Sequence, residues 1–236
     1  MLDEQTRRAC GLTALGLQAC GADGLLMPET GKALGKLKRR AQRQGFDMRV
    51  ASSFRDYHHQ LRIFNAKARG QRPVTDDHDR LVDPSALSPQ DYLLAILRFS
   101  ALPGTSRHHW GTDIDVWNAA AVAADYSLQL SMAEYAPSGP FGEFSSWLRA
   151  RVDADDAEGF YLPYATDTGG VAPEPWHLSY RADAAGLAER QTREVLEPLW
   201  SGSFVQSAEP PVTEPLALLT IVRPQIDALL MRYVVS

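Results

Sequence analysis

The order of its predicted helices and strands most limits how this 236-residue chain can fold. Residues 46–53 alternate apolar and polar side chains, with Phe46, Met48 and Val50 on one side, as expected for a half-buried strand. Further short strands are predicted at 112–117, 159–162 and 176–180. Helical patterns separate these strands irregularly, without the βαβ alternation of a parallel sheet. We therefore predict an α+β fold with a small mixed or antiparallel sheet that is flanked by helices.

The helices are predicted from apolar residues at helical spacing and from local start and stop signals. Asp56 can cap a helix that ends at Gly70, and Ser88 begins another helix that stops before Pro103. Residues 71–87 are polar and lack a period, which predicts a surface loop. The predicted helices cover residues 3–19, 30–44, 56–70, 88–102, 141–154 and 216–234.

The composition is that of an ordinary globular protein, and it excludes some partners. Hydrophobic residues make up 44% of the chain and charged residues 22%, so a sizeable core can be buried. The net charge is −5, and the densest basic stretch, residues 36–43, fits a solvated helix face, so no nucleic-acid partner is expected. The apolar stretch 216–235 contains Arg223, Asp227 and Arg232, so no membrane span is expected.

The N-terminal segment lacks a basic start followed by an unbroken apolar stretch, so no secretory signal is predicted. The chain as given is therefore expected to be cytoplasmic, with the cell envelope, reached by another export route, as the alternative. Cys10 and Cys20 are the only cysteines, which is too few for a disulfide framework. The oligomeric state is not indicated by the sequence.

Two segments collect the residue types of a catalytic metal site. One is SRHHWGTDID, which ends at Asp115, and the other is EPWH, which begins at Glu174. Two histidines and one carboxylate are a usual ligand set for catalytic zinc, and they leave a fourth position open for water. A second carboxylate nearby can take a proton from that water. We therefore predict that His108, Asp115 and His177 bind zinc and that Glu174 is the catalytic base.

The spacing of these residues limits how they can meet. On one straight strand, His108 and Asp115 would lie about 23 Å apart and would point to opposite faces. The chain must therefore turn between them, and Gly111 tolerates such a turn. In EPWH, a bend at Pro175 lets the first and last residues reach one site.

Each of these residues also has an ordinary explanation when it is taken alone. A single His108 is more often a core or surface histidine than a ligand, and Asp115 fits an ordinary carboxylate at a strand end. A structural zinc site with His109 as fourth ligand is another alternative, but His109 would point away from His108 in an extended chain. The other common zinc motif, His-Glu-x-x-His, is absent. The combination of the two segments favours a metal site.

The same segments resemble a known family. SRHHWGTDID matches Ser-x-His-x-x-Gly-x-x-x-Asp and EPWH matches Glu-x-x-His, the patterns of zinc D-alanyl-D-alanine carboxypeptidases of the VanY type. The resemblance covers roughly residues 50–180 and implies the ligands and base proposed above. SSFRDYHHQ, residues 52–60, resembles a further family stretch. It implies that Arg55 faces the scissile carbonyl or the substrate carboxylate and that Gln60 lines the substrate pocket. The resemblance also implies that Ser106, at the start of the first motif, lines this pocket.

One position departs from the family pattern. Many members have alanine two residues before the metal-binding aspartate, where this chain has Asp113. The extra carboxylate either faces solvent or changes the charge near the site. Arg55 also has a physical argument of its own, because a fixed cation stabilises the negative charge of a tetrahedral intermediate. A salt bridge between Arg55 and Asp56 is its ordinary alternative.

The resemblance implies a zinc metallopeptidase that acts on a peptidoglycan stem peptide or muropeptide. Removal of a terminal D-amino acid is the first choice, with Arg62 or Arg181 as further candidates to hold the terminal carboxylate. The alternatives are a peptidoglycan endopeptidase of the L-alanyl-D-glutamate type and a zinc-binding recognition module without catalysis. Retention of Glu174 together with Arg55 favours catalysis, because a binding module needs no base. We predict three parts, which are a helical extension (1–45), a zinc peptidase core (46–185) and a helical tail with a Pro-rich connector (186–236).

Overall fold

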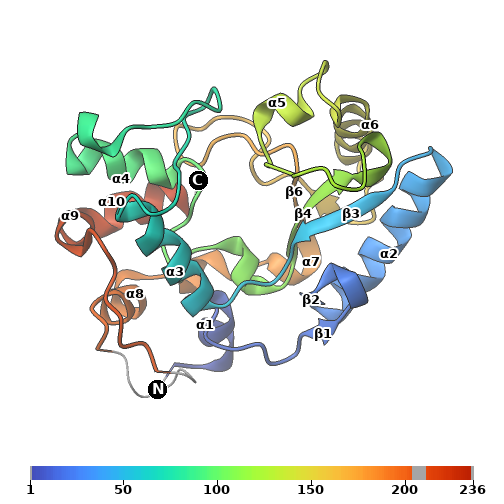
Figure 1. Cartoon of the computed structure of the whole chain (residues 1–236). Coiled ribbons are helices and arrows are strands. Elements are labelled where there is room, and N and C mark those ends of the chain that lie inside the picture. Colours follow the sequence, from blue (N-terminus) through green and yellow to red (C-terminus); the bar gives the residue numbers. More distant parts are fainter. Residues whose placement is uncertain (1, 204–210, 235–236) are drawn as a thin grey trace.

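The computed structural model describes residues 2–203 and 211–234 of the chain (Figure 1). Its main sheet is antiparallel, and its strands lie in the order β3-β4-β6-β5. These strands are β3 (Met48–Ser52), β4 (Asp113–Asn118), β5 (Phe160–Tyr161) and β6 (His177–Tyr180). A small second sheet pairs β1 (Gln18–Ala19) with β2 (Leu25–Leu26). The predicted α+β fold with a small sheet flanked by helices is confirmed.

Along the chain, the α-helices of the described residues come before, between and after these strands. They are α1 (Glu4–Ala9), α2 (Pro28–Arg43), α3 (Tyr57–Ala68), α4 (Pro89–Leu97), α5 (Met132–Tyr135), α6 (Gly142–Asp153), α7 (Arg181–Ala184), α8 (Arg193–Trp200), α9 (Leu219–Val222) and α10 (Ile226–Tyr233). Short 3₁₀ turns lie at Gly21–Asp23, Pro84–Ala86, Arg107–Trp110, Ala119–Ala121, Ala188–Arg190 and Arg223–Gln225. No helix of the described residues is long and apolar enough to cross a membrane.

The predicted helix starts agree with the structure where a capping side chain was identified. The Asp56 carboxylate accepts a hydrogen bond from the backbone N–H of His59 at the start of α3. The Ser88 hydroxyl likewise accepts from the backbone N–H of Asp91 at the start of α4. In each case the side chain satisfies a backbone donor that has no partner inside the helix.

Three predicted helices are wrong in extent. The first ends at Ala9 rather than residue 19, because the chain turns sharply at Gly11. Gly11 has φ +71°, and a Cβ there would lie 2.3 Å from the His109 ring, so the turn packs directly on that histidine. The helix predicted for 88–102 ends at Leu97. The last one is divided into α9 and α10 by a 3₁₀ turn that contains Pro224, which lacks the N–H that a continuous helix needs.

Two main clusters of buried side chains form the core. One lies where α2 and α6 pack on the sheet and includes Leu37, Ile114 and Phe144. The other lies among α3, α4, α8 and α10, which gather on the left of Figure 1, and includes Phe64 and Trp200. The helices beyond residue 186 therefore share a core with α3 and α4. The predicted three-part division stays a prediction, and residues 208–210 of its connector lie outside the described residues.

Candidate metal centre

The register between β4 and β6 brings the last residues of the two motifs together. Asp115 lies opposite His177, and Asp113 lies opposite Ser179. Residues two apart on a strand point to the same face, so these four side chains share one face of the sheet. Residue Ser52 of β3 pairs with the other side of Asp115, just beyond an irregularity in the register.

His108 reaches this face from a short 3₁₀ turn, Arg107–Trp110, that comes before β4. The turn ends at Gly111, which adopts the left-handed conformation with φ +71°. A Cβ on Gly111 would also meet a methyl carbon of Leu17, which would have to move, but the main reason for glycine here is the left-handed conformation. The predicted turn between His108 and Asp115 is confirmed.

Glu174 is brought to the same place by a tight turn. The backbone N–H of His177 donates to the carbonyl of Glu174 at 3.1 Å, and Pro175 and Trp176 are the two central residues of the turn. Proline suits the first central position because its fixed φ matches that of common turns. The backbone N–H of Glu174 also donates to the carbonyl of Tyr164. The predicted bend at Pro175 therefore exists, and it directs Glu174 and His177 into one site.

The candidate ligand atoms lie close together and are buried. His108 Nε2 lies 3.2 Å from Asp115 Oδ2, and His177 Nδ1 lies 3.2 Å from Asp115 Oδ1. One ligand atom from each of the three residues lies within 4.8 Å of the others. Despite its short contact with the His177 ring, the buried Asp115 Oδ1 accepts no well-aligned hydrogen bond from the described residues. A cation at the centre of the group would supply the missing partner, so the three residues fit a metal ion.

The hydrogen bonds around the two rings determine which nitrogen faces that centre. His108 Nδ1 lies 2.9 Å from the carbonyl oxygen of Ser53, which can only accept, so Nδ1 carries the proton and Nε2 is free. His177 Nε2 lies 2.9 Å from Asp113 Oδ1, so in this ring Nε2 carries the proton and Nδ1 is free. Both free nitrogens point to Asp115, which is the arrangement that metal-binding histidines need.

The electrostatics of this cluster favour the charged forms of Asp115 and His177. Burial alone would raise the pKa of Asp115, but the nearby rings of His108 and His177 outweigh it and hold that pKa well below its usual range. Burial would lower the pKa of His177, but its hydrogen bond to Asp113 and the nearby carboxylates of Asp115 and Glu174 raise that pKa well above the ordinary value. A metal ion must therefore displace a proton from this ring, since only neutral imidazole coordinates.

Arg55 lies beside the candidate ligands. Its backbone N–H donates to the carbonyl of His108 at 3.0 Å. Its guanidinium donates to Gln60 Oε1 at 2.8 Å and to Ser52 Oγ at 3.0 Å. Burial lowers the pKa of Arg55, while the negative charges of Asp115 and Glu174 act in the opposite direction. The alternative of an Arg55–Asp56 salt bridge is not what the described contacts show.

The other two predicted pocket residues lie near Arg55 and His108. Gln60 is buried, and its Nε2 donates to the carbonyl of Ala101 while its Oε1 accepts from Arg55. It therefore holds the Arg55 guanidinium in place. Ser106 is buried and begins the 3₁₀ turn that carries His108, but its side chain does not cap that turn. The roles of Gln60 and Ser106 toward substrate stay predictions.

His109 does not contribute to the metal centre. Its Nδ1 donates to the carbonyl of Arg55 and its Nε2 accepts from the backbone N–H of Gly104 at 3.0 Å. Both nitrogens are therefore engaged away from the candidate ligands, which rules out His109 as fourth ligand. It points away because it lies in a 3₁₀ turn, and not because the chain is extended, as the sequence argument assumed.

Asp113 is buried beside the candidate ligands. The alternative that it faces solvent is wrong, because its exposed fraction is 0%. Burial would raise the pKa of Asp113, but the charge of Arg107 and a hydrogen bond from His177 lower it to about 2. Arg107 and Tyr164, whose ring packs edge-on against His177 at 5.1 Å, were not identified from the sequence.

A model of the VanY D-alanyl-D-alanine carboxypeptidase family matches residues 24–183. The chain belongs to this family. The match includes both motifs, all three candidate ligands and the segment around Arg55, and it begins well before the expected start of the peptidase core at residue 46. Family membership and the buried three-residue site together make the chain a zinc-dependent peptidase.

Two curated relatives come from Haemophilus influenzae, and both are described as uncharacterized proteins. One is 33% identical over 110 residues, which is 46% of this chain and 82% of the relative. The other is 39% identical over 77 residues, which is 33% of this chain and 53% of the relative.

Several solved peptidase structures are also similar. A mutant of the vancomycin-resistance D,D-pentapeptidase VanY from a VanB-type cassette, in complex with Zn(II), is 21% identical, with a TM-score of 0.49. The similarity covers 76% of this chain and 88% of that one. The LD-carboxypeptidase LdcB is also 21% identical, with a TM-score of 0.47 over 75% of this chain and 71% of that one.

Proposed function

We propose that this chain hydrolyses a peptide bond in peptidoglycan stem peptides and that it releases a C-terminal D-amino acid. Family membership supports the reaction class. The observation that carries the proposal is the position of Glu174, whose Oε2 lies 3.3 Å from the metal-facing Nδ1 of His177. Glu174 is thus beside the ligand set without completing it, where a base can reach a water molecule at the metal.

Metal binding, proton transfer and stabilisation of the oxyanion are assigned to different residues of the site. His108, Asp115 and His177 would hold zinc, which when bound polarises the scissile carbonyl and lowers the pKa of water. Glu174 accepts the proton of the attacking water and returns it to the leaving amine. Arg55 offers the developing oxyanion a cation that Gln60 and Ser52 already hold in position.

Positive charge near Arg55 supports recognition of a substrate carboxylate. Lys67, on the same face of α3 as Gln60, donates to Ser100 Oγ at 2.6 Å. Burial, and then the positive charges of Arg72 and Arg55, lower the pKa of Lys67 to about 8, while Glu174 acts in the opposite direction. The ammonium is still charged at neutral pH, and no carboxylate of the described residues forms a salt bridge with it. Lys67 is thus a better candidate for the terminal carboxylate than the two arginines considered from the sequence.

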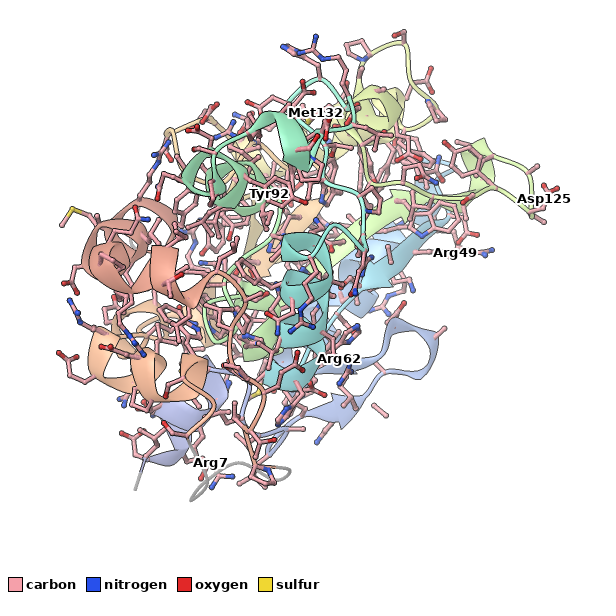
Figure 2. All side chains as sticks on the ribbon, turned by 60° about the vertical axis from the view of Figure 1, so that its left-hand side comes forward. Arg7, Arg49, Arg62, Tyr92, Asp125 and Met132 are labelled. Carbon is pink, nitrogen blue, oxygen red and sulfur yellow. The ribbon has the colours of Figure 1, made fainter. Side chains whose placement is uncertain are left out.

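Those two arginines lie elsewhere. The Arg62 side chain projects to solvent from the exposed side of α3 in Figure 2. The Arg181 guanidinium packs over the ring of Tyr161 at 4.5 Å from its centroid, beyond the end of β6.

The role of Glu174 is tested by Glu174→Gln. This change keeps size and hydrogen bonding but removes the ability to accept a proton, so kcat should fall by a factor on the order of 100 or more. Zinc content, measured by elemental analysis, should stay near that of the wild type. Glu143→Gln on the exposed side of α6 is the matched control and should change neither quantity. Loss of zinc together with activity in Glu174→Gln would make Glu174 a ligand and would overturn its role as the base.

Recognition of a free C-terminal carboxylate on the substrate is tested with a pair of peptides. One peptide ends in a free D-Ala carboxylate, and the other is the same peptide as its C-terminal amide. A charged contact is worth about 1.5–3 kcal/mol, so the amide should lose roughly 10- to 150-fold in kcat/KM. Equal rates for the two peptides would reject the carboxypeptidase and favour the endopeptidase alternative.

A further inference from the structure

Asp113 is the position at which this chain departs from the family pattern, and it makes direct contact with a candidate ligand. Its Oδ1 accepts from His177 Nε2 at 2.9 Å and from Arg107 Nε at 2.8 Å. Its Oδ2 accepts from Thr112 Oγ1 at 2.6 Å and from Ser179 Oγ at 3.0 Å. The carboxylate is fully buried and each oxygen has two donors, so it has one fixed orientation.

Arg107 is fixed just as firmly on the far side of Asp113. Its Nη2 donates to Tyr161 hydroxyl at 2.8 Å and to Ser179 Oγ at 2.6 Å. Its guanidinium also stacks on the ring of Trp110, at 4.3 Å from the centroid. A buried carboxylate is costly unless it is paired, and Arg107 offsets that cost. The departure from alanine therefore adds a neutral pair next to the site rather than a net negative charge.

We propose that the Arg107–Asp113 pair positions His177, so that its Nδ1 faces the metal centre and its Nε2 stays protonated toward Asp113. An imidazole ring without a fixed acceptor can turn over and exchange its two nitrogens. A carboxylate that accepts from the second nitrogen of a metal-binding histidine fixes the ring and makes it a stronger ligand. Asp113 and Arg107 are thus positioning residues. The inference rests on the zinc site of the proposed function.

The first test is zinc affinity, measured by competition with a chromophoric chelator. Asp113→Ala restores the residue that many family members have, yet in this chain it should weaken zinc binding by about 10- to 100-fold, because His177 loses its acceptor. Asp113→Asn keeps an acceptor without the charge, so its zinc affinity should lie between those of the wild type and Asp113→Ala. Thr112→Val is the matched control, because it removes one hydrogen bond to Asp113 and leaves the contact with His177 intact. Its zinc Kd should stay within about twofold of the wild type.

A second variant separates positioning from general stability. Asp113→Ala alone leaves Arg107 as a largely buried cation without its carboxylate, so it should also lower the melting temperature. The double variant Arg107→Met with Asp113→Ala removes that cation and should recover the melting temperature without recovering zinc affinity. Recovery of both would mean that the pair only stabilises the fold, and this would overturn the proposal.

The wild-type protein offers a third measurement that does not depend on any variant folding. In ¹H–¹⁵N spectra of the zinc-loaded chain, the protonated nitrogen of His177 should be Nε2. Coordination through Nε2, or an Asp113→Ala Kd within about twofold of the wild type, would refute the positioning role. If the wild type binds no zinc, the proposed function fails. If it binds zinc and the variants bind equally well, only this inference fails.

Discussion

The buried ring of His109 should make the folded chain sensitive to acid through one identifiable group. Its Nε2 accepts from Gly104 and its Nδ1 donates to Arg55, and only the neutral ring can make both bonds. Burial is the main reason that the pKa of His109 falls from 6.5 to about 3, and the positive charge of Arg55 adds to it. Protonation would thus remove an acceptor in a site that is closed to water.

The sign and size of the effect follow from this shift. In the unfolded chain, His109 takes up a proton below about pH 6.5, whereas the folded chain resists protonation until about pH 3. The stability that depends on the neutral ring is therefore fully present above pH 6.5 and is lost as the pH falls toward 3. A difference of about 3.5 pH units at 1.36 kcal/mol each gives a loss on the order of 5 kcal/mol.

The assay is urea unfolding of the zinc-free protein between about pH 7 and pH 4. His109→Gln can still donate and accept hydrogen bonds but does not titrate. Other groups titrate in both proteins, so the comparison isolates the ring. The free energy of unfolding of the wild type should fall more steeply than that of the variant, by about 1.4 kcal/mol per pH unit. Parallel curves would refute a neutral, buried His109.

Three further predictions address the metal, the substrate and the N-terminal turn. Alanine at any one of the three candidate ligands should reduce zinc from about one ion per chain to a small fraction, and elemental analysis that finds normal zinc would remove that residue from the set. Lys67→Met should lower kcat/KM for the peptide acid by about 10-fold or more and leave the amide unchanged. In the wild type, KM for the acid should rise above about pH 8, where Lys67 loses its charge. Gly16→Ala should lower the free energy of unfolding by about 1–3 kcal/mol, because alanine is strained at positive φ. Gly11→Ala should lower it further, because Gly11 also has positive φ and its added Cβ would meet the His109 ring.

The sequence predicted the parts of the fold and the site that depend on local signals. Capping residues, the alternation in β3 and the turns at Gly111 and Pro175 are each determined within a few residues, and the structure agrees with them. The first helix was predicted too long because Gly11 turns against His109, a contact across almost 100 residues that no local pattern contains. The helix α8 was missed although its buried residues Leu196, Leu199 and Trp200 lie at helical spacing, and Pro198 inside it is a residue that argues against a helix interior.

The acceptor role of Asp113 is predictable from the sequence. Asp113 and Asp115 are two apart on a predicted strand, so they share a face, and a carboxylate beside a metal ligand on that face is a natural hydrogen-bond acceptor. What the sequence could not supply was the partner of that carboxylate. Arg107 reaches Asp113 only because the 3₁₀ turn folds back on the strand. Lys67 was missed because its position depends on how α3 packs against residues 100 and 101.

The pairing of β4 with β6 also makes zinc binding depend on the alignment of these two strands. Asp115 meets His177 only in one register, and a slip by one residue would turn every side chain of one strand to the opposite face. A misaligned chain could keep much of its secondary structure and still offer no place where the three ligand atoms converge. Zinc would then bind only after the two strands have found their correct partners. Gain of zinc affinity during refolding should therefore coincide with the final alignment of these strands and lag behind helix formation.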